Sequence, residues 1–194
     1  MSQSQSFSRT RTLVECALLI AIGIVLGKIT LFSMPYGGSV TFFSALPFVL
    51  ISFRHGIKWG LLSGFVNGLI GIITGFSAPP SGTIPAFIGV ILLDYLLAFM
   101  ALGLADLFAK PFNNRFIGVG VGTVIASLLR LVCSFLSGWL LWGSYQSEYE
   151  WAIGLPTWAY SLIYNASYMI PETILTAVAA VLLCKFMPKL FNRV

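Results

Sequence analysis

Long apolar runs, separated by short polar segments, constrain the fold of this chain more than any other feature. A helix needs about 20 apolar residues to cross the roughly 30 Å hydrocarbon core of a bilayer, where backbone groups must satisfy their hydrogen bonds internally. The sequence therefore predicts an all-α integral membrane protein with six transmembrane helices in one bundle. The runs that form these helices cover residues 12–31, 41–54, 57–76, 84–109, 116–142 and 157–187.

The composition supports a single membrane domain. Only 9% of the 194 residues are charged and 58% are hydrophobic, whereas a soluble domain carries roughly 25% charged residues. We expect a membrane domain over residues 11–194 and a disordered cytoplasmic tail over residues 1–10, which lack the apolar core of a signal peptide. The expected location is the cell membrane.

The basic residues indicate an orientation. The net charge is +5, but the positive side chains gather in alternate connections, while the connections at 32–40, 76–83 and 143–156 contain none. Because basic loops stay on the cytoplasmic side, both termini are predicted to be cytoplasmic. The partner indicated by this charge is the lipid bilayer, not nucleic acid. The residues concerned are Arg9, Arg11, Arg54, Lys58, Lys110, Arg115, Lys185, Lys189 and Arg193.

Patterns that would indicate an enzyme do not occur in this sequence. It has no P-loop and no H-E-x-x-H pattern, and its one histidine, His55, lies in a connection between apolar runs. The three cysteines lack C-x-x-C spacing. We therefore expect no catalytic residues, no metal site and no enzymatic activity.

Three ionisable residues lie well inside apolar runs: Asp94, Arg130 and Glu172. From a rise of about 1.5 Å per residue, all three fall near the middle of the membrane. A charge at that depth costs at least roughly 2.5–3.5 kcal/mol, so these side chains should face one another or a wet cavity. They form either a salt-bridge cluster that locks the helices or part of a ligand site. One arginine against two carboxylates leaves a negative charge, which favours a proton or a cationic ligand.

The run that contains Glu172 also carries regularly spaced aromatic and amide side chains. Tyr160, Tyr164 and Tyr168 follow one another at intervals of four residues, and Asn165 shares a helix face with Glu172. Aromatic faces near a carboxylate suit a flat, cationic heterocycle. Packing between helices is the alternative role for such a tyrosine stripe.

A second polar and aromatic line is expected along the helix at 116–142. It starts at Arg130 and continues through Ser134, Gly138 and Trp142. The outer connections are rich in glycine, proline and aromatic residues, among them Tyr36. These connections form either an interfacial aromatic belt or lids over an outward-facing pocket, in which Tyr36 would contact the ligand.

Small residues at intervals of four mark close helix contacts. Ala17 and Ala21 lie in the first run, and Gly60, Gly64 and Gly68 lie in the third. Such faces let membrane helices approach closely. Each stripe packs either inside the bundle or, in the case of the alanines, against another membrane protein.

The segments "RLVCSFLSGWLLWGSY" and "WAYSLIYNASYMIPE", with "LLDYLLAFMALGLADLF" and "LPFVLISFRHGIKWGLLSG", resemble one known family. They are similar to the thiamine-specific S-components of energy-coupling factor (ECF) transporters, over residues 13–191. The resemblance implies a six-helix protein that binds a vitamin near its outer side. It also implies work with one transmembrane subunit and two ATPase subunits. ATP would be used by these partners, and the chain itself would hold no cofactor.

The resemblance also assigns roles to individual residues. It places the acidic vitamin contact at Asp94, and it places the docking motif for the transmembrane partner at Ala17 and Ala21. Ser134 and Gly38 stand where the family has a histidine and a tryptophan. The remaining contacts that the resemblance implies are Gly138, Trp142, Tyr160 and Asn165.

These two differences keep a vitamin B6 form open as an alternative ligand to thiamine. A stand-alone transporter that relays protons through its buried charges is an alternative from a different class. A structural membrane partner without a ligand is the third.

Overall fold

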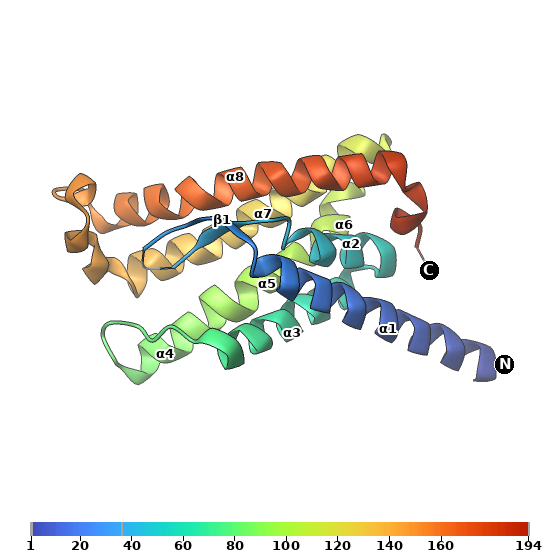
Figure 1. The fold of residues 1–194 in the computed structure, drawn as a ribbon, viewed down its shortest axis with the longest axis horizontal. Helices are drawn as coiled ribbons and strands as arrows, with labels where there is room; N and C mark the ends of the chain where they lie inside the picture. The colour runs from blue at the N-terminus through green and yellow to red at the C-terminus, as the bar shows by residue number, and fades with distance from the viewer. Residues whose placement is uncertain (1, 36, 194) are drawn as a thin grey trace.

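The computed structural model describes residues 2–35 and 37–193, and it is mostly helical (Figure 1). Two long helices, α7 and α8, pack along each other, and α3 lies beside the segment from α4 to α5. The elements in chain order are α1 (Ser2–Gly27), β1 (Thr30–Ser33), β2 (Ser39–Thr41), α2 (Leu46–His55), α3 (Ile57–Gly75), α4 (Ile84–Val90), the π-helix η1 (Ile91–Leu97), α5 (Ala98–Leu102), α6 (Ala105–Ala109), α7 (Arg115–Leu140), the 3₁₀-helices η2 (Gly143–Glu148) and η3 (Glu150–Ala152), α8 (Thr157–Phe186) and the 3₁₀-helix η4 (Pro188–Phe191).

Five helical segments of the described residues are long and apolar enough to cross a membrane. This agrees with the predicted class of helical membrane protein. The second predicted helix, at 41–54, is not a full span, because α2 has only 10 residues and is therefore about 15 Å long. Its side chains from Pro47 to Phe53 are buried, so α2 is a core helix inside the bundle. The five segments are Arg9–Gly27, Ile57–Gly75, Ile84–Leu102, Arg115–Leu140 and Thr157–Phe186.

A β-hairpin replaces the ends of the first two predicted helices, so the prediction of an all-α fold is wrong at this point. Strands β1 and β2 pair antiparallel, with Thr30 opposite Thr41 and Ser33 opposite Ser39. β-Branched residues favour extended backbone, and the turn contains Gly37 and Gly38 at φ angles of +110° and +86°. Glycine reaches such angles without steric strain.

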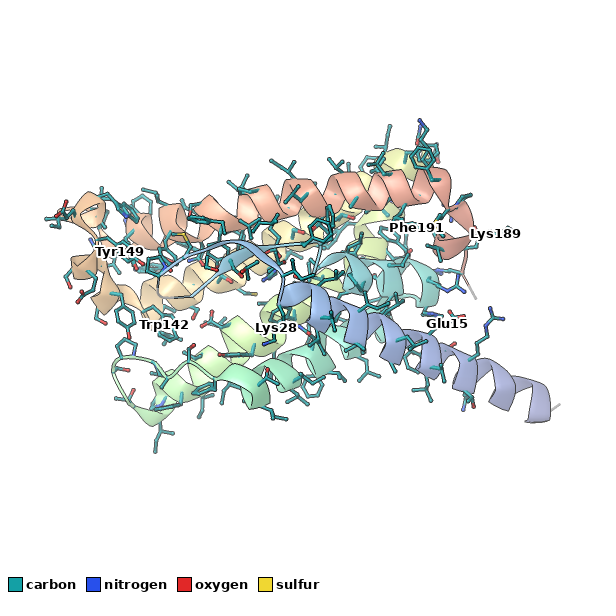
Figure 2. The ribbon with its side chains drawn as sticks, in the orientation of Figure 1. Glu15, Lys28, Trp142, Tyr149, Lys189 and Phe191 are labelled. Atoms are coloured by element: carbon teal, nitrogen blue, oxygen red, sulfur yellow. The ribbon has the colours of Figure 1, made fainter. Side chains whose placement is uncertain are left out.

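The two chain ends lie at the same end of the bundle (Figure 1). Helix α1 begins at Ser2 and so includes most of the residues that the sequence assigns to a disordered tail. Tyr149 and Trp142 lie at the opposite end from Glu15 and Lys189 (Figure 2).

The predicted helix at 84–109 is divided into α4, η1, α5 and α6. Its middle part packs closely on the glycine stripe of α3. A Cβ atom on Gly60 would lie 2.6 Å from the carbonyl oxygen of Gly103, and one on Gly64 would lie 2.7 Å from the Cα of Met100. The glycine stripe therefore serves packing within the bundle.

Candidate functional site

A cavity of about 510 Å³ lies inside the bundle and is lined by α1, the hairpin, α2, α3, η1, α7 and α8. One predicted ligand contact, Tyr36, lies outside the described residues. The fold thus brings together side chains that are up to 148 positions apart, from Ile24 to Glu172. The predicted ligand contacts that line the cavity are Asp94, Arg130, Ser134, Gly138, Trp142, Tyr160, Tyr164, Asn165, Tyr168 and Glu172.

Asp94 enters the cavity from the π-helix η1. One carboxylate oxygen, Oδ2, accepts hydrogen bonds from Ser137 Oγ at 2.6 Å and from Trp142 Nε1 at 3.0 Å. Both donors are neutral, and no ion pair joins Asp94 to a cation among the described residues. The sequence predicts that the buried charges face one another or a wet cavity, and of these two alternatives Asp94 faces the cavity. π-Helical turns occur frequently at functional sites.

Arg130 and Glu172 do pair, as the sequence predicts. Arg130 Nη1 lies 3.2 Å from Glu172 Oε2, and the guanidinium stacks over the ring of Phe99 at 4.9 Å. The other carboxylate oxygen of Glu172 accepts hydrogen bonds from Thr41 Oγ1 at 2.7 Å and from Ser44 Oγ at 3.3 Å. Glu172 thus neutralises Arg130 and also ties α8 to the end of the hairpin.

Asn165 holds α7 and α8 together at the cavity wall. Its Nδ2 group donates to the carbonyl oxygens of Ser161 at 2.9 Å and Ser134 at 3.3 Å. Its Oδ1 atom accepts a hydrogen bond from the Tyr168 hydroxyl at 2.8 Å. A Cβ atom on Gly138 would lie 3.0 Å from Asn165 Nδ2, so a glycine at this position permits the close contact between the helices.

Aromatic rings form much of the remaining wall. Trp142 stacks on Tyr145, with ring centroids 5.9 Å apart and planes inclined by 18°. On α8, Tyr160 contacts Tyr164 at 5.8 Å, and Tyr164 contacts Tyr168 edge-on at 6.2 Å. The cavity therefore combines an acid without a cationic partner with flat aromatic surfaces, an arrangement that attracts an organic cation.

Several lining residues were not among the predicted contacts. Lys28 lies near the end of the first predicted run, directly after α1, and it lines the cavity. Asn67 and Thr74 are polar positions inside an apolar run, and this signal could have identified them. The hairpin residues had no such signal. The missed polar and aromatic residues are Lys28, Ser39, Thr41, Ser44, Phe48, Asn67, Thr74, Ser77, Tyr95, Phe99, Tyr145 and Ser161.

The predicted docking residues lie elsewhere. Ala17 and Ala21 are exposed on α1 and do not line the cavity. Leu18 and Val25 on the same helix are 60% and 63% exposed. This face of α1 has no partner among the described residues and is available for lipid or another protein.

An ionic cluster ties α1 to α2 at the end of the bundle where the two chain ends lie. Glu15 Oε2 lies 2.6 Å from Arg54 Nε, and Glu15 Oε1 lies 3.0 Å from Arg11 Nε. His55 Nε2 lies 3.1 Å from Glu15 Oε2, and only 1% of the His55 side chain is exposed. Burial lowers the pKa of His55 below its ordinary value of 6.5.

An apolar helical bundle around a polar, aromatic-walled cavity defines a class: helical membrane proteins with an internal cavity of small-solute size. Comparison with known proteins narrows this class. Residues 13–192 match the family model described as "Thiamine transporter protein (Thia_YuaJ)". The chain belongs to this thiamine transporter family.

Individual relatives agree with the family model. The chain is 36% identical to the thiamine transporter ThiT of Bacillus subtilis, over 99% of this chain and 98% of the relative. It is 27% identical to ThiT of Lacticaseibacillus paracasei, over 77% and 75% of the two chains. The solved structure of ThiT from Listeria monocytogenes shares the fold, with a TM-score of 0.76 and 22% identity over 95% of this chain and 99% of that one. The relatives from Bacillus subtilis and Lacticaseibacillus paracasei are named as transporters, not as enzymes.

Proposed function

We propose that this chain is the membrane subunit that captures thiamine for uptake, with the vitamin bound in the cavity. The observation that carries the proposal is the environment of Asp94. Among the described residues its carboxylate accepts side-chain hydrogen bonds from two neutral donors and forms no ion pair, so in this part of the chain no cation neutralises the buried negative charge. Thiamine carries a permanent positive charge in its thiazolium ring, which supplies the missing partner. The names of the two relatives support the choice of ligand.

The aromatic wall supports the same ligand. A flat cation gains from contact with aromatic faces, by about 0.5–1 kcal/mol where exposed and by about 2 kcal/mol or more where desolvated. Trp142, Tyr160 and Tyr164 line the cavity, and Trp142 also donates to Asp94. The ring and the carboxylate are thus placed to contact one ligand together.

We further propose that the chain works with ECF partners, namely one transmembrane subunit and two ATPase subunits that use ATP. The exposed alanines on α1 are the proposed docking face. Both termini are proposed to lie in the cytoplasm of the cell. This orientation rests on the basic residues, since Arg54, which pairs with Glu15, and Lys189 lie near the end of the bundle that holds the chain ends.

Calorimetry on the detergent-purified protein tests the ligand, with thiamine and pyridoxine as alternative titrants. We expect saturable binding of thiamine and no competition by pyridoxine. A protein that binds pyridoxine but ignores thiamine would overturn the proposed substrate. Pyridoxine is the relevant competitor because Ser134 and Gly38 leave a different cavity surface from the one the family resemblance implies.

Uptake measurements test the partners. In cells that lack other thiamine import, we expect accumulation of labelled thiamine only when the transmembrane and ATPase subunits are co-expressed. Uptake by the chain alone that collapses on addition of a proton ionophore would contradict the partner module and support a stand-alone proton-coupled transporter.

A further inference from the structure

One stripe of α8 holds the hairpin over the cavity. The Tyr164 hydroxyl donates to the carbonyl oxygen of Gly37 at 2.7 Å, and two turns further along, Glu172 accepts from Thr41. Between these two contacts lies Tyr168, which faces Gly38. The stripe therefore contacts Gly37, Gly38 and Thr41 in turn, from three helix positions spaced four residues apart.

The two glycines of the turn meet different surroundings. A Cβ atom on Gly38 would lie 2.5 Å from both Cε1 and Cζ of Tyr168, whereas a Cβ atom on Gly37 would meet nothing within 4 Å. Both residues have positive φ angles, +110° for Gly37 and +86° for Gly38. The backbone conformation thus favours glycine at both positions, but only Gly38 is also required by close contact with a side chain.

Tyr168 connects this contact to the cavity. The side chain is 8% exposed and lines the cavity, and its hydroxyl donates to Asn165 Oδ1 at 2.8 Å. Asn165 in turn donates to the carbonyl oxygen of Ser134 on α7. A displacement of the tyrosine ring by a side chain at position 38 would therefore also displace the hydrogen bond that orients Asn165.

We propose that Gly38 and Tyr168 act as one specificity-determining pair for a flat, cationic heteroaromatic ligand. The missing side chain at position 38 lets the Tyr168 ring fill the space between the hairpin and α8, and the ring fixes the shape of the cavity wall beside Asn165. Tyr168 is a positioning residue in this account, because it acts through Asn165 and through the cavity shape. The inference rests on the proposed function and names the residues that set its selectivity.

A mutant cycle in the detergent-purified protein tests the pair. Gly38→Ala should weaken thiamine binding by roughly 5- to 150-fold, the range expected from overpacking a filled site. In a Tyr168→Phe background the same loss should persist, since the ring remains. In a Tyr168→Ala background the further loss caused by Gly38→Ala should shrink to that caused by Gly37→Ala. Gly37→Ala is the matched control, because it has a positive φ angle and no contact with the ring.

Two further measurements on the same variants test the coupling and the role in specificity separately. Unfolding temperatures of the ligand-free variants should show the same non-additivity as the affinities, so the contact is tested even if Tyr168→Ala abolishes binding. The ratio of affinities for thiamine and for an analogue with a six-membered pyridinium ring should change in Gly38→Ala and in Tyr168→Ala. It should change little in Gly37→Ala.

The outcomes separate this inference from the proposed function. If wild-type protein does not bind thiamine, the proposed function fails, while the unfolding temperatures still report the coupling of Gly38 with Tyr168. If Gly38→Ala has the same effect with tyrosine and with alanine at position 168, the pair does not act as a unit and the inference is overturned. A constant affinity ratio in all variants would overturn the role in specificity.

Discussion

Replacement of Asp94 by asparagine removes the buried negative charge and preserves the shape of the side chain. Both hydrogen bonds to Asp94 end on Oδ2, so the amide oxygen of asparagine can take this position and keep Ser137 and Trp142 bonded. What is lost is the attraction between the carboxylate and a cationic ligand. The substitution therefore isolates the electrostatic contribution of this residue to binding.

The magnitude follows from the surroundings of the carboxylate. Two unit charges about 4 Å apart interact with about 4 kcal/mol at an effective dielectric constant of about 20. Truncating one partner of a buried charged pair costs about 2–5 kcal/mol in binding. With about 1.4 kcal/mol for each tenfold change, a loss of about 2–4 kcal/mol weakens binding by roughly 30- to 700-fold.

Titration calorimetry of thiamine into the purified variants measures this loss, and the unfolding temperature reports whether the bundle stays intact. Asp106→Asn is the matched control. Asp106 pairs with Arg193 and does not line the cavity, so this variant should bind as wild type does. Unchanged affinity in a folded Asp94→Asn protein would refute the assignment of Asp94 as the cation partner.

Glu172→Gln should lower the unfolding temperature and weaken thiamine binding less than Asp94→Asn does, because Glu172 mainly joins Arg130 to Thr41 and Ser44. A larger loss of affinity than that of Asp94→Asn in calorimetry would contradict this. Ala17→Trp combined with Ala21→Trp should abolish uptake that depends on the partner subunits and leave thiamine binding intact, since both residues lie on the exposed face of α1; equal loss of binding and uptake would show that the pair packs internally. Because burial lowers the pKa of His55, the unfolded state binds more protons at this residue, so stability should fall as pH decreases from about 6.5 through the lower folded-state pKa. His55→Gln should lose this dependence in thermal unfolding between pH 7 and pH 5 (about the range in which histidine titrates), and an unaltered pH profile would exclude His55 as its source.

Much of the cavity was predictable from residue types and spacing. A charged side chain in an apolar run is costly unless it has a partner or a wet cavity, and this argument identified Asp94, Arg130 and Glu172. Helical periodicity then grouped Tyr160, Tyr164 and Tyr168 on one face. All six of these side chains line the cavity. Periodicity within a helix depends only on local geometry, which is why the sequence contains it.

The pairing of the buried charges was not predictable in full. Depth along the helices placed Asp94, Arg130 and Glu172 at one level, but depth does not determine the rotation of one helix against another. The π-helical turns of η1 change that rotation locally, and in the structure Asp94 accepts from Ser137 and Trp142. The ion pair of Arg130 with Glu172 is independent of this change.

The β-hairpin was also not predictable from local sequence patterns. Thr30–Ser33 and Ser39–Thr41 are short segments, and hydropathy alone assigns residues 30, 31 and 41 to the neighbouring helices and residues 32–40 to a connection without strands. Their strand pairing joins residues 30 and 41, and contacts with α8 hold the turn in place. These contacts join positions more than 120 residues apart, so no local pattern contains them.

The sequence by itself determined the membrane class, the helical runs and the residues that carry the polar chemistry, because hydropathy, charge and periodicity act over a few turns of chain. Only the tertiary structure decided that α2 is a short core helix, that Asp94 has neutral partners and that Tyr168 packs against Gly38. Each of these depends on how separate elements approach one another. That approach is set by close packing of the whole bundle, and packing depends on side chains from distant parts of the chain at once.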